Sequence, residues 1–300
     1  MIPYDRINQQ FGDYRLLRLL GQSGLSEVYL GEHVHFRTQV AVKLLGGQRS
    51  GEDAQKFLTQ ASTLAHLQHP HIMPVLDFGI NDGLAFLIMG YAPNGTLRQR
   101  HPKGTRVPLD TIVTYIKQIA EALQYVHQRQ LVHRDIKPHN MLLGANNEIM
   151  LSDFGIAVVS QSFDPLHSII HDFEGTIPYA APEQLQGQPR RGSDQYALGI
   201  VVYEWLSGQW PFSGTFDVIA HQHLFAPPPS LQEKGITIAP AIEQVIMKTL
   251  EKEPEKRFPS IMHFSDALEQ ACPQKKSLKT APEAKQQPKR QFMSPMPFSR

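Results

Sequence analysis

The sequence predicts a bilobal α+β protein, with a small antiparallel sheet lobe carrying one helix at residues 14–90 and a larger, mainly helical lobe at residues 91–271. Two observations support this prediction. Before residue 90, apolar and β-branched residues form short runs separated by polar and glycine-containing turns, as in a meander of strands. From residue 109 onward, apolar residues recur at the spacing of helices.

In the small lobe, one helix is expected to interrupt the strands. The stretch Glu52–Leu67 contains neither glycine nor proline, and its apolar residues Phe57, Ala61 and Leu64 recur at helical spacing. Pro70 follows closely and restricts the residue before it to extended conformations, so the helix should end before it. The strands are expected at Tyr14–Leu20, Glu27–Gly31, Gln39–Leu45, Met73–Phe78 and Leu84–Met89.

In the large lobe, at least four helices are expected. The first carries a single apolar stripe, as a helix facing a core requires, formed by Ile112, Ile116, Ile119, Leu123 and Val126. Ser193-Asp194 offers an N-cap for a second helix, which is apolar on nearly every side and should be buried in the centre. Two further helices are expected at about Ala239–Leu250 and Ser260–Ala271.

The composition excludes several classes of function. The chain has 300 residues and a formal net charge of +1, so no global charge favours nucleic acid or an anionic membrane. The single cysteine, Cys272, excludes an internal disulfide and suits a reducing compartment, so a cytoplasmic chain is expected. The longest apolar stretch, Tyr196–Leu206, includes Glu204 and is too short to cross a bilayer.

Both ends are expected to lie outside the folded body. Residues 1–13 are interpreted as a lead, and residues 272–300 as a disordered tail or linker rich in proline, lysine and glutamine. From residue 273 onward, seven basic residues stand against one acidic residue. Two interpretations of this basic tail stay open, a segment that binds an anionic surface and a solvated linker.

Two motifs at a fitting interval carry the chemistry. The first is His133-Arg134-Asp135-Ile-Lys137-Pro-His-Asn140, which taken alone could be a polar turn after a helix. Eighteen residues after its aspartate comes Asp153-Phe154-Gly155, flanked by apolar runs. A third segment, Ala181-Pro182-Glu183, follows downstream.

Together these motifs resemble the protein kinase superfamily, and most closely its bacterial eukaryotic-type (Hanks-type) Ser/Thr protein kinases, over about residues 14–270. The resemblance implies the bilobal kinase fold, Mg-ATP as the phosphoryl donor and protein Ser/Thr hydroxyls as acceptors, including self-association for autophosphorylation. Asp135 would orient the hydroxyl and accept its proton, and Lys137 would reach the γ-phosphate. Asn140 and Asp153 would hold Mg²⁺, because hard oxygen ligands suit a hard cation.

The resemblance also assigns roles around the activation segment, residues 153–183. Thr176 would hydrogen-bond the catalytic Asp and Lys, and Arg134 would pair with a phosphorylated activation segment. Glu183 would pair with Arg257, and Asp194 would brace the catalytic loop. The Ala-Pro-Glu ending favours protein substrates. Three serines are candidate phosphosites or simply solvated loop residues, namely Ser160, Ser162 and Ser168.

The nucleotide would bind in the small lobe. Ala41 and Lys43 share one face of a strand because side chains alternate, which would place Ala41 against adenine and Lys43 at the α- and β-phosphates; a surface lysine is the alternative. Met89 falls at the gatekeeper position, and the backbone of Gly90 to Ala92 would form the hinge. The remaining adenine contacts would be Leu20, Val28 and Leu142. The resemblance also implies a regulatory spine of Leu64, Val75, His133 and Phe154.

Two features depart from the family pattern. The phosphate loop runs from Gly21 through Ser23, Gly24 and Ser26, so serine replaces its second and third glycines, and glycine permits the positive φ and close backbone approach needed there. The helix position that should carry a glutamate for Lys43 is Gln60, which can accept a hydrogen bond but offers no charge.

These departures leave three readings. The first is an active Ser/Thr protein kinase, favoured by the intact Asp135, Lys137, Asn140 and Asp153. The second is a pseudokinase that serves as a nucleotide-binding or scaffold module, favoured by the three substitutions on the small lobe. The third is a small-molecule phosphotransferase, which the Ala-Pro-Glu segment opposes.

Overall fold

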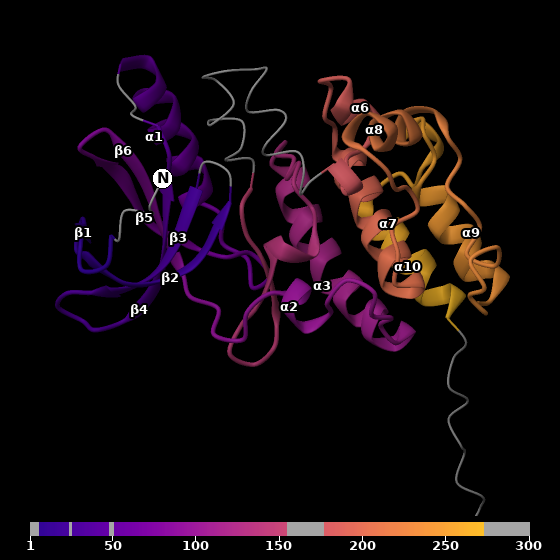
Figure 1. The fold of residues 1–300 in the computed structure, drawn as a ribbon, viewed down its shortest axis with the longest axis horizontal. Helices are drawn as coiled ribbons and strands as arrows, with labels where there is room; N and C mark the ends of the chain where they lie inside the picture. The colour runs from indigo at the N-terminus through magenta and orange to yellow at the C-terminus, as the bar shows by residue number, and fades with distance from the viewer. Residues whose placement is uncertain (1–5, 24–25, 48–50, 155–176, 273–300) are drawn as a thin grey trace, which may run out of the picture.

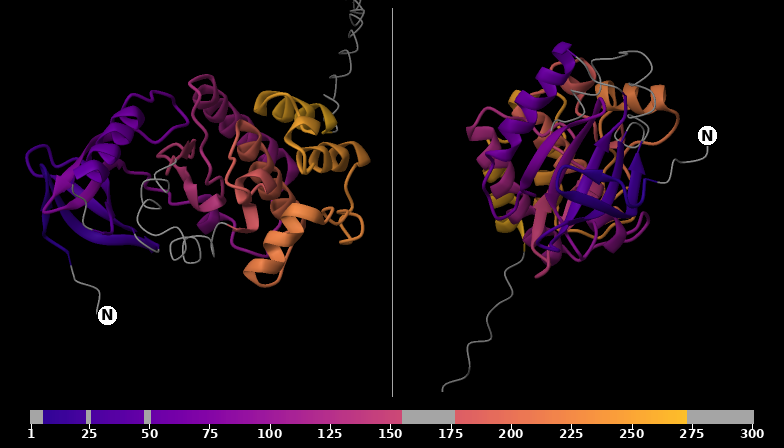
Figure 2. Two further views of the ribbon diagram at one scale, coloured as in Figure 1. Left: turned by 90° about the horizontal axis from the view of Figure 1, so that it is seen from above. Right: turned by 90° about the vertical axis from the view of Figure 1, so that its left-hand side faces the viewer.

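The two expected lobes lie side by side in the computed structural model, which describes residues 6–23, 26–47, 51–154 and 177–272. Figure 1 shows the strands and α1 at one end, and α6 to α10 at the other, with α2 and α3 between them. The view from above in Figure 2 shows the same separation. The α+β prediction is therefore confirmed.

The small lobe is built on one antiparallel sheet of six strands in the order β1-β2-β3-β4-β6-β5. The strands are β1 Gln10–Phe11, β2 Tyr14–Ser23, β3 Ser26–His33, β4 Gln39–Leu45, β5 Val75–Asn81 and β6 Leu84–Gly90. The first of them falls within residues 1–13, where a lead was expected. It pairs with β2 and buries Phe11 against Phe86, so the sheet begins earlier than the apolar pattern indicates, because two residues carry no readable alternation.

Helix α1, Gly51–Ala65, covers the sheet from one side. It buries Phe57 and Ala61, which are one helical turn apart. These two side chains join an apolar cluster with Ala41 and Met89 from the sheet. Burial of a large apolar side chain stabilises a fold by roughly 1.5–3 kcal/mol. The helix is therefore held with its apolar face on the sheet and its opposite face in solvent.

The lobes are joined by strand-like contacts as well as by the chain itself. The segment after α1 forms an isolated bridge between Ile72 and Leu151, and the Met73 N–H donates to the Leu151 carbonyl at 2.8 Å. On the other side of the connection, the Leu143 N–H donates to the Gly95 carbonyl at 2.8 Å. The hairpin that carries Leu143 and Leu151 is therefore tied both to the small-lobe segment between α1 and β5 and to the connection after β6.

The large lobe consists mainly of helices around a short hairpin. The elements are α2 Leu97–Arg100, α3 Leu109–Gln128, η1 Pro138–Asn140, β7 Met141–Leu143, β8 Ile149–Leu151, η2 Ile177–Tyr179, α6 Pro182–Leu185, α7 Arg191–Ser207, α8 Phe216–Phe225, α9 Pro240–Thr249, η3 Pro254–Lys256 and α10 Ile261–Ala271. The five residues of the predicted stripe on α3 are fully buried. Among the described residues, no helix combines the length and the apolar character needed to cross a membrane.

Helix α7 is the central buried helix that the sequence predicts, with every residue from Ser193 to Ser207 buried. Its predicted N-cap is wrong. The helix begins at Arg191 and its N-cap is Arg190, so Ser193 is the third helical residue. From that position the Ser193 Oγ accepts a hydrogen bond from the Arg190 N–H at 2.9 Å. Asp194 is thereby released from capping, and its carboxylate points toward the catalytic loop.

Gly199 lets α7 approach α9 and the residue after it closely. A Cβ atom added at this position would lie 2.8 Å from Thr249 Cγ2 and 3.0 Å from Leu250 Cδ2. Both of these side chains are buried. The absence of a side chain at Gly199 is therefore a packing requirement of the core.

We predict that Gly199→Ala lowers the free energy of unfolding by about 1 kcal/mol, because overpacking costs about 1–3 kcal/mol and the gain in helix propensity returns only about 1. Denaturant unfolding checks this. Adding Thr249→Ser removes the methyl group that the new Cβ would meet, so the double variant should regain stability over Gly199→Ala. A rise in stability for Gly199→Ala alone would contradict the packing argument.

Candidate active site

The catalytic loop brings Asp135, Lys137 and Asn140 together. The Lys137 Nζ lies 2.9 Å from Asp135 Oδ2. The Asn140 Nδ2 donates to the same Oδ2 and to the Asp135 carbonyl, each at 2.8 Å. These contacts fix the carboxylate orientation from two sides, and the short turn η1 supplies the spacing between the three residues.

The electrostatics keep the Asp135 carboxyl group ionised. Burial by itself raises the pKa of this group, but the charge of Lys137 and the hydrogen bonds from Lys137 and Asn140 outweigh burial and hold the pKa below its ordinary value. A group in this state can orient a hydroxyl by accepting its hydrogen bond at neutral pH.

Asp194 on α7 holds the catalytic loop from beneath, as the sequence predicted. Its two carboxylate oxygens accept hydrogen bonds from the backbone N–H groups of His133 at 2.9 Å and Arg134 at 2.8 Å. The His127 Nε2 lies 2.7 Å from the same carboxylate. Arg134 adopts a positive φ of 67°, which is uncommon for a residue with a side chain, and these bonds stabilise the turn.

The hairpin of β7 and β8 sets the position of Asn140 relative to Asp153. Met141 pairs with Leu151, so the residues just outside the hairpin, Asn140 and Ser152, face each other. The Ser152 N–H donates to the Asn140 carbonyl at 3.0 Å. No group of three His, Cys, Asp or Glu side chains suited to a metal occurs in the described residues. Two ligands nevertheless fit Mg²⁺, which usually takes one or two carboxylates together with substrate phosphates.

Lys43 of β4 is buried and reaches across to Asp153. Its Nζ lies 2.7 Å from the Asp153 Oδ1. Gln60, which could have accepted a hydrogen bond from Lys43, is exposed on α1, and among the described residues no hydrogen bond joins the two. Phe57 and Ala61 of α1 are buried against the sheet, whereas Gln60 beside them is not.

The residues expected around adenine form one apolar surface. Val28, Ala41, Met89, Ala92 and Leu142 belong to the same cluster. Ala41 and Met89 are direct partners in the register of β4 and β6.

The start of the phosphate loop is only partly within the described residues. Leu20 lies at an irregularity in the pairing of β2 with β3, and Gly21 pairs with Val28. Ser26 pairs with Leu45 on β4. Gly24 and the side chain of Ser23 lie outside the described residues.

The residues expected to form a spine are also in contact. The rings of His133 and Phe154 have centroids 4.4 Å apart. Leu64, Val75 and Phe154 line one small enclosed space. Leu64 packs against the cores of both lobes, so it bridges them.

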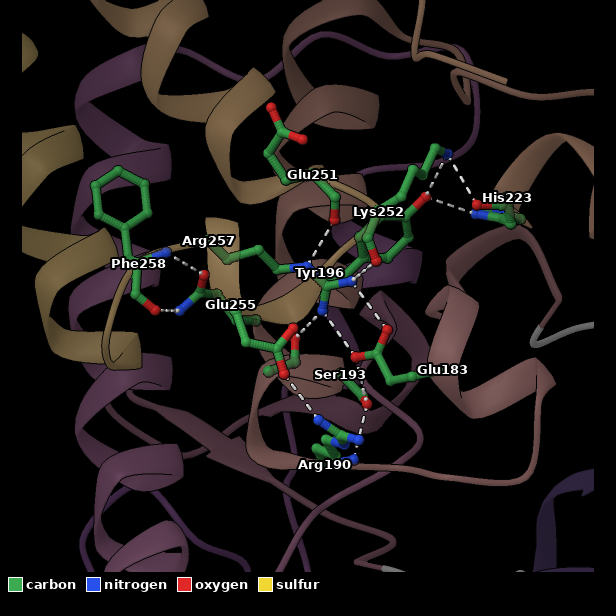
Figure 3. Close-up of polar contacts among 12 residues, drawn as sticks. Glu183, Arg190, Ser193, Tyr196, His223, Glu251, Lys252, Glu255, Arg257 and Phe258 are labelled. Carbon is green, nitrogen blue, oxygen red and sulfur yellow. Dashed lines mark hydrogen bonds and ion pairs between the residues drawn. The ribbon is translucent and has the colours of Figure 1, made fainter. Parts of the chain in front are cut away.

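The end of the activation segment is anchored by a buried ion pair that the sequence predicted. In Figure 3 the Arg257 guanidinium lies against the Glu183 carboxylate, with distances of 2.7 and 2.9 Å. The same guanidinium donates to three backbone carbonyls, and the Ser193 hydroxyl donates to Glu183 at 2.8 Å. Burial alone raises the pKa of Glu183, but the hydrogen bonds and charge of Arg257 reverse this and lower it.

Two other polar groups near this segment escaped the sequence analysis. Lys252, also in Figure 3, donates to the His223 carbonyl at 2.8 Å, and burial lowers its pKa to about 8. Glu204 pairs with Arg98 and accepts a hydrogen bond from the Tyr179 hydroxyl. A lone carboxylate in an apolar helix is a signal that a partner exists, but the sequence does not indicate which of many basic residues it is.

Several predicted residues lie outside the described part of the chain. Thr176 and the candidate phosphosites Ser160, Ser162 and Ser168 are among them. The catalytic loop also contacts α6, because the Arg134 carbonyl accepts a hydrogen bond from the Gln184 side chain at 2.8 Å.

The comparisons with known proteins agree with this geometry. Residues 14–270 match the family described as the protein kinase domain. The chain is 34% identical over 251 residues to the serine/threonine-protein kinase PrkC of Bacillus subtilis, covering 82% of this chain and 38% of PrkC. It is 38% identical over 272 residues to the serine/threonine-protein kinase PknF of Mycobacterium tuberculosis, covering 86% and 56%. The chain thus spans about half or less of the length of these relatives.

We predict that Arg257→Leu lowers the free energy of unfolding by about 3–5 kcal/mol, because it leaves the Glu183 carboxylate buried and unpaired. Adding Glu183→Gln should recover part of this loss. Since the pKa of Glu183 is lowered in the fold, the stabilisation by the pair is present above the ordinary pKa of a glutamate and is lost as pH falls through the folded-state value. Denaturant unfolding at several pH values measures both effects.

The matched control for this pair is Lys117→Leu, which removes a half-exposed ion pair with Glu269 between α3 and α10. It should cost less than about 1 kcal/mol. Equal losses for the two leucine variants would contradict the role given to Arg257.

Proposed function

The chain belongs to the protein kinase family, and on that premise we propose that it transfers the γ-phosphoryl group of ATP to serine or threonine hydroxyls of proteins. The observation that carries the proposal is the assembly of Asp135, Lys137 and Asn140 within hydrogen-bonding distance of one another. Phosphoryl transfer depends on positioning and charge stabilisation more than on covalent chemistry by the protein, and these three residues are arranged for positioning.

In this proposal the residues of the catalytic loop act on the acceptor. The Asp135 carboxylate accepts a hydrogen bond from the substrate hydroxyl and takes its proton as the new P–O bond forms and the bond to ADP breaks. Lys137 stabilises negative charge on the transferring group. The contact of Lys137 with Asp135 at 2.9 Å supports this assignment, because it places both groups at one acceptor site.

On the donor side, Mg²⁺ would be held by Asn140 and Asp153, whose oxygens suit this cation. Lys43 would neutralise charge on the α- and β-phosphates. It is buried beside Asp153, so the same short pair orients the lysine and the proposed metal ligand. The adenine ring would contact Val28, Ala41 and the neighbouring apolar cluster.

The pseudokinase reading is not favoured. The substitutions that suggested it, at Ser23, Ser26 and Gln60, leave the acceptor residues untouched, and the relatives named above are serine/threonine-protein kinases. Phosphorylation of the chain by a second copy, and a place in the cytoplasm suited to a lone cysteine, belong to the same proposal.

We predict that Asp135→Asn lowers phosphate incorporation from labelled ATP by at least about 100-fold, because general-base positioning contributes roughly 10²–10⁴-fold. Purified chain, Mg²⁺ and a generic protein substrate provide the assay. The variant should still gain thermal stability from Mg-ATP. Asp266→Asn, the same change on the exposed face of α10, is the control and should retain activity. If wild type and Asp135→Asn are equally silent while Mg-ATP still stabilises both, the chain is a pseudokinase.

We predict that Gln60→Glu changes kcat/KM by less than about threefold. The side chain is exposed and forms no hydrogen bond with Lys43 in the described structure, and exposed ion pairs contribute about 0–1 kcal/mol. Gln55→Glu, the same charge change at another exposed position of α1, is the matched control. A rise of tenfold for Gln60→Glu alone would show that α1 turns this residue toward Lys43 during turnover.

A further inference from the structure

The chain beside the catalytic loop is uniformly basic. Between Leu97 and Val107, which includes α2 and the loop after it, there is no acidic residue, and four residues are basic, namely Arg98, Arg100, Lys103 and Arg106. Helix α2 packs against η1, the turn that contains His139 and Asn140. The acceptor side of the catalytic loop is therefore bordered by a segment of one charge sign, although the chain as a whole is nearly neutral.

A buried carboxylate beneath this segment, that of Glu204, is already occupied. Glu204 of α7 is 4% exposed, and its two oxygens lie 2.8 and 2.9 Å from the Arg98 guanidinium. The Tyr179 hydroxyl donates to it at 2.7 Å. With its lone pairs engaged and its charge neutralised, Glu204 is not available to attract a basic substrate residue.

Lys103 and His139 are two of the exposed side chains at this border. Lys103 is exposed, and its ammonium lies 4.3 Å from the ring centroid of Trp210, whose Nε1–H donates to the Tyr179 hydroxyl at 3.1 Å. This contact draws the flexible lysine toward the end of the activation segment. His139 is exposed on η1, two residues after Lys137.

His139 adds no positive charge to this border at neutral pH. Loss of hydration, followed by the charges of Arg98, Lys137 and Lys103, lowers the pKa of its imidazole to about 4. Lysines therefore carry the charge here, since Lys137 lies 2.9 Å from Asp135 Oδ2 and Lys103 lies beside Trp210.

We propose that Lys103 and Lys137, here called the basic rim, select protein acceptors that carry Asp or Glu close to the target hydroxyl. The inference rests on the proposed kinase function and names its substrate class. A carboxylate beside the hydroxyl would meet Lys103 directly, whereas a lysine or arginine there would meet like charges and find no free carboxylate in Glu204.

The test compares three peptides that share one central Ser and differ in their flanking residues, which are neutral, Asp-rich or Lys-rich. Wild-type full chain should phosphorylate the Asp-rich peptide with a kcat/KM about tenfold above the Lys-rich one, since attraction of Asp and repulsion of Lys at the basic rim each change kcat/KM by roughly threefold. The ratio should shrink in high salt. Preference for the Lys-rich peptide would overturn the proposal.

Variants that change the charge at single positions test which residue causes the preference between the peptides. Lys103→Glu should lower the ratio of Asp-rich to Lys-rich kcat/KM at least tenfold, and His139→Glu, which adds a negative charge close to Lys137 in the chain, should act in the same direction. The matched control is Lys234→Glu, the same change at an exposed lysine in the connection between α8 and α9, and it should leave the ratio as in wild type. An equal ratio in wild type and Lys103→Glu would exclude the basic rim as the selective surface.

A binding measurement separates this proposal from the proposed activity. Fluorescence anisotropy with labelled Asp-rich and Lys-rich peptides reports affinity whether or not the chain turns over ATP. Tighter binding of the Asp-rich peptide that is lost in Lys103→Glu would support the basic rim even if no phosphate is incorporated. Turnover without any charge preference in binding or in kcat/KM would leave the kinase proposal standing and refute the rim.

Discussion

The catalytic loop depends on one buried carboxylate, that of Asp194 at the start of α7. A buried anion is costly unless hydrogen bonds compensate for lost hydration, and here two backbone N–H groups and the His127 ring provide them. The hydrogen bonds that stabilise the Asp194 carboxylate also stabilise the loop that donates them. The same bonds hold Arg134 in its uncommon positive-φ conformation, so the position of Asp135, one residue later, follows from the position of a fully packed helix.

The metal-binding and nucleotide-binding residues expected around this loop are also held by hydrogen bonds and an ion pair. The hairpin of β7 and β8 is tied to the small-lobe segment before β5 and to the connection after β6, so Asn140 and Asp153 are held relative to both lobes by backbone hydrogen bonds. Lys43 then links the sheet to Asp153 through a short charged contact. Lys43, Asp135 and Asn140 are thereby positioned by hydrogen bonds and ion pairs to packed elements, as accurate positioning requires. Movement of one side chain would change how often that side chain is in place, but it would not move the backbone elements that carry the site.

Much of this site could be predicted from sequence because its members occur at fixed spacings within short motifs. Asp135, Lys137 and Asn140 meet through local geometry. The pairing of Glu183 with Arg257 is long-range, and it could be predicted because the resemblance to a family implies it. Where neither source applies, prediction failed. The bond between Arg98 and Glu204 joins residues 106 positions apart, and nothing in periodicity or propensity selects one basic partner over another. The N-cap of α7 was misplaced for a related reason, since Ser193 can satisfy a backbone N–H from inside the first turn as well as from before it.

The charges of the large lobe show why composition alone says little about the substrate. A net charge of +1 is a sum over the chain, whereas an approaching polypeptide responds to the few charges within a Debye length of about 8–10 Å. Of the described carboxylates near Lys137, those of Asp135 and Glu204 are paired internally, and the positive charge of Lys103 is not balanced by an acidic neighbour within residues 97–107. Internal pairing therefore performs two tasks at once. It stabilises the fold beneath the catalytic loop, and it decides which sign of charge the acceptor site presents.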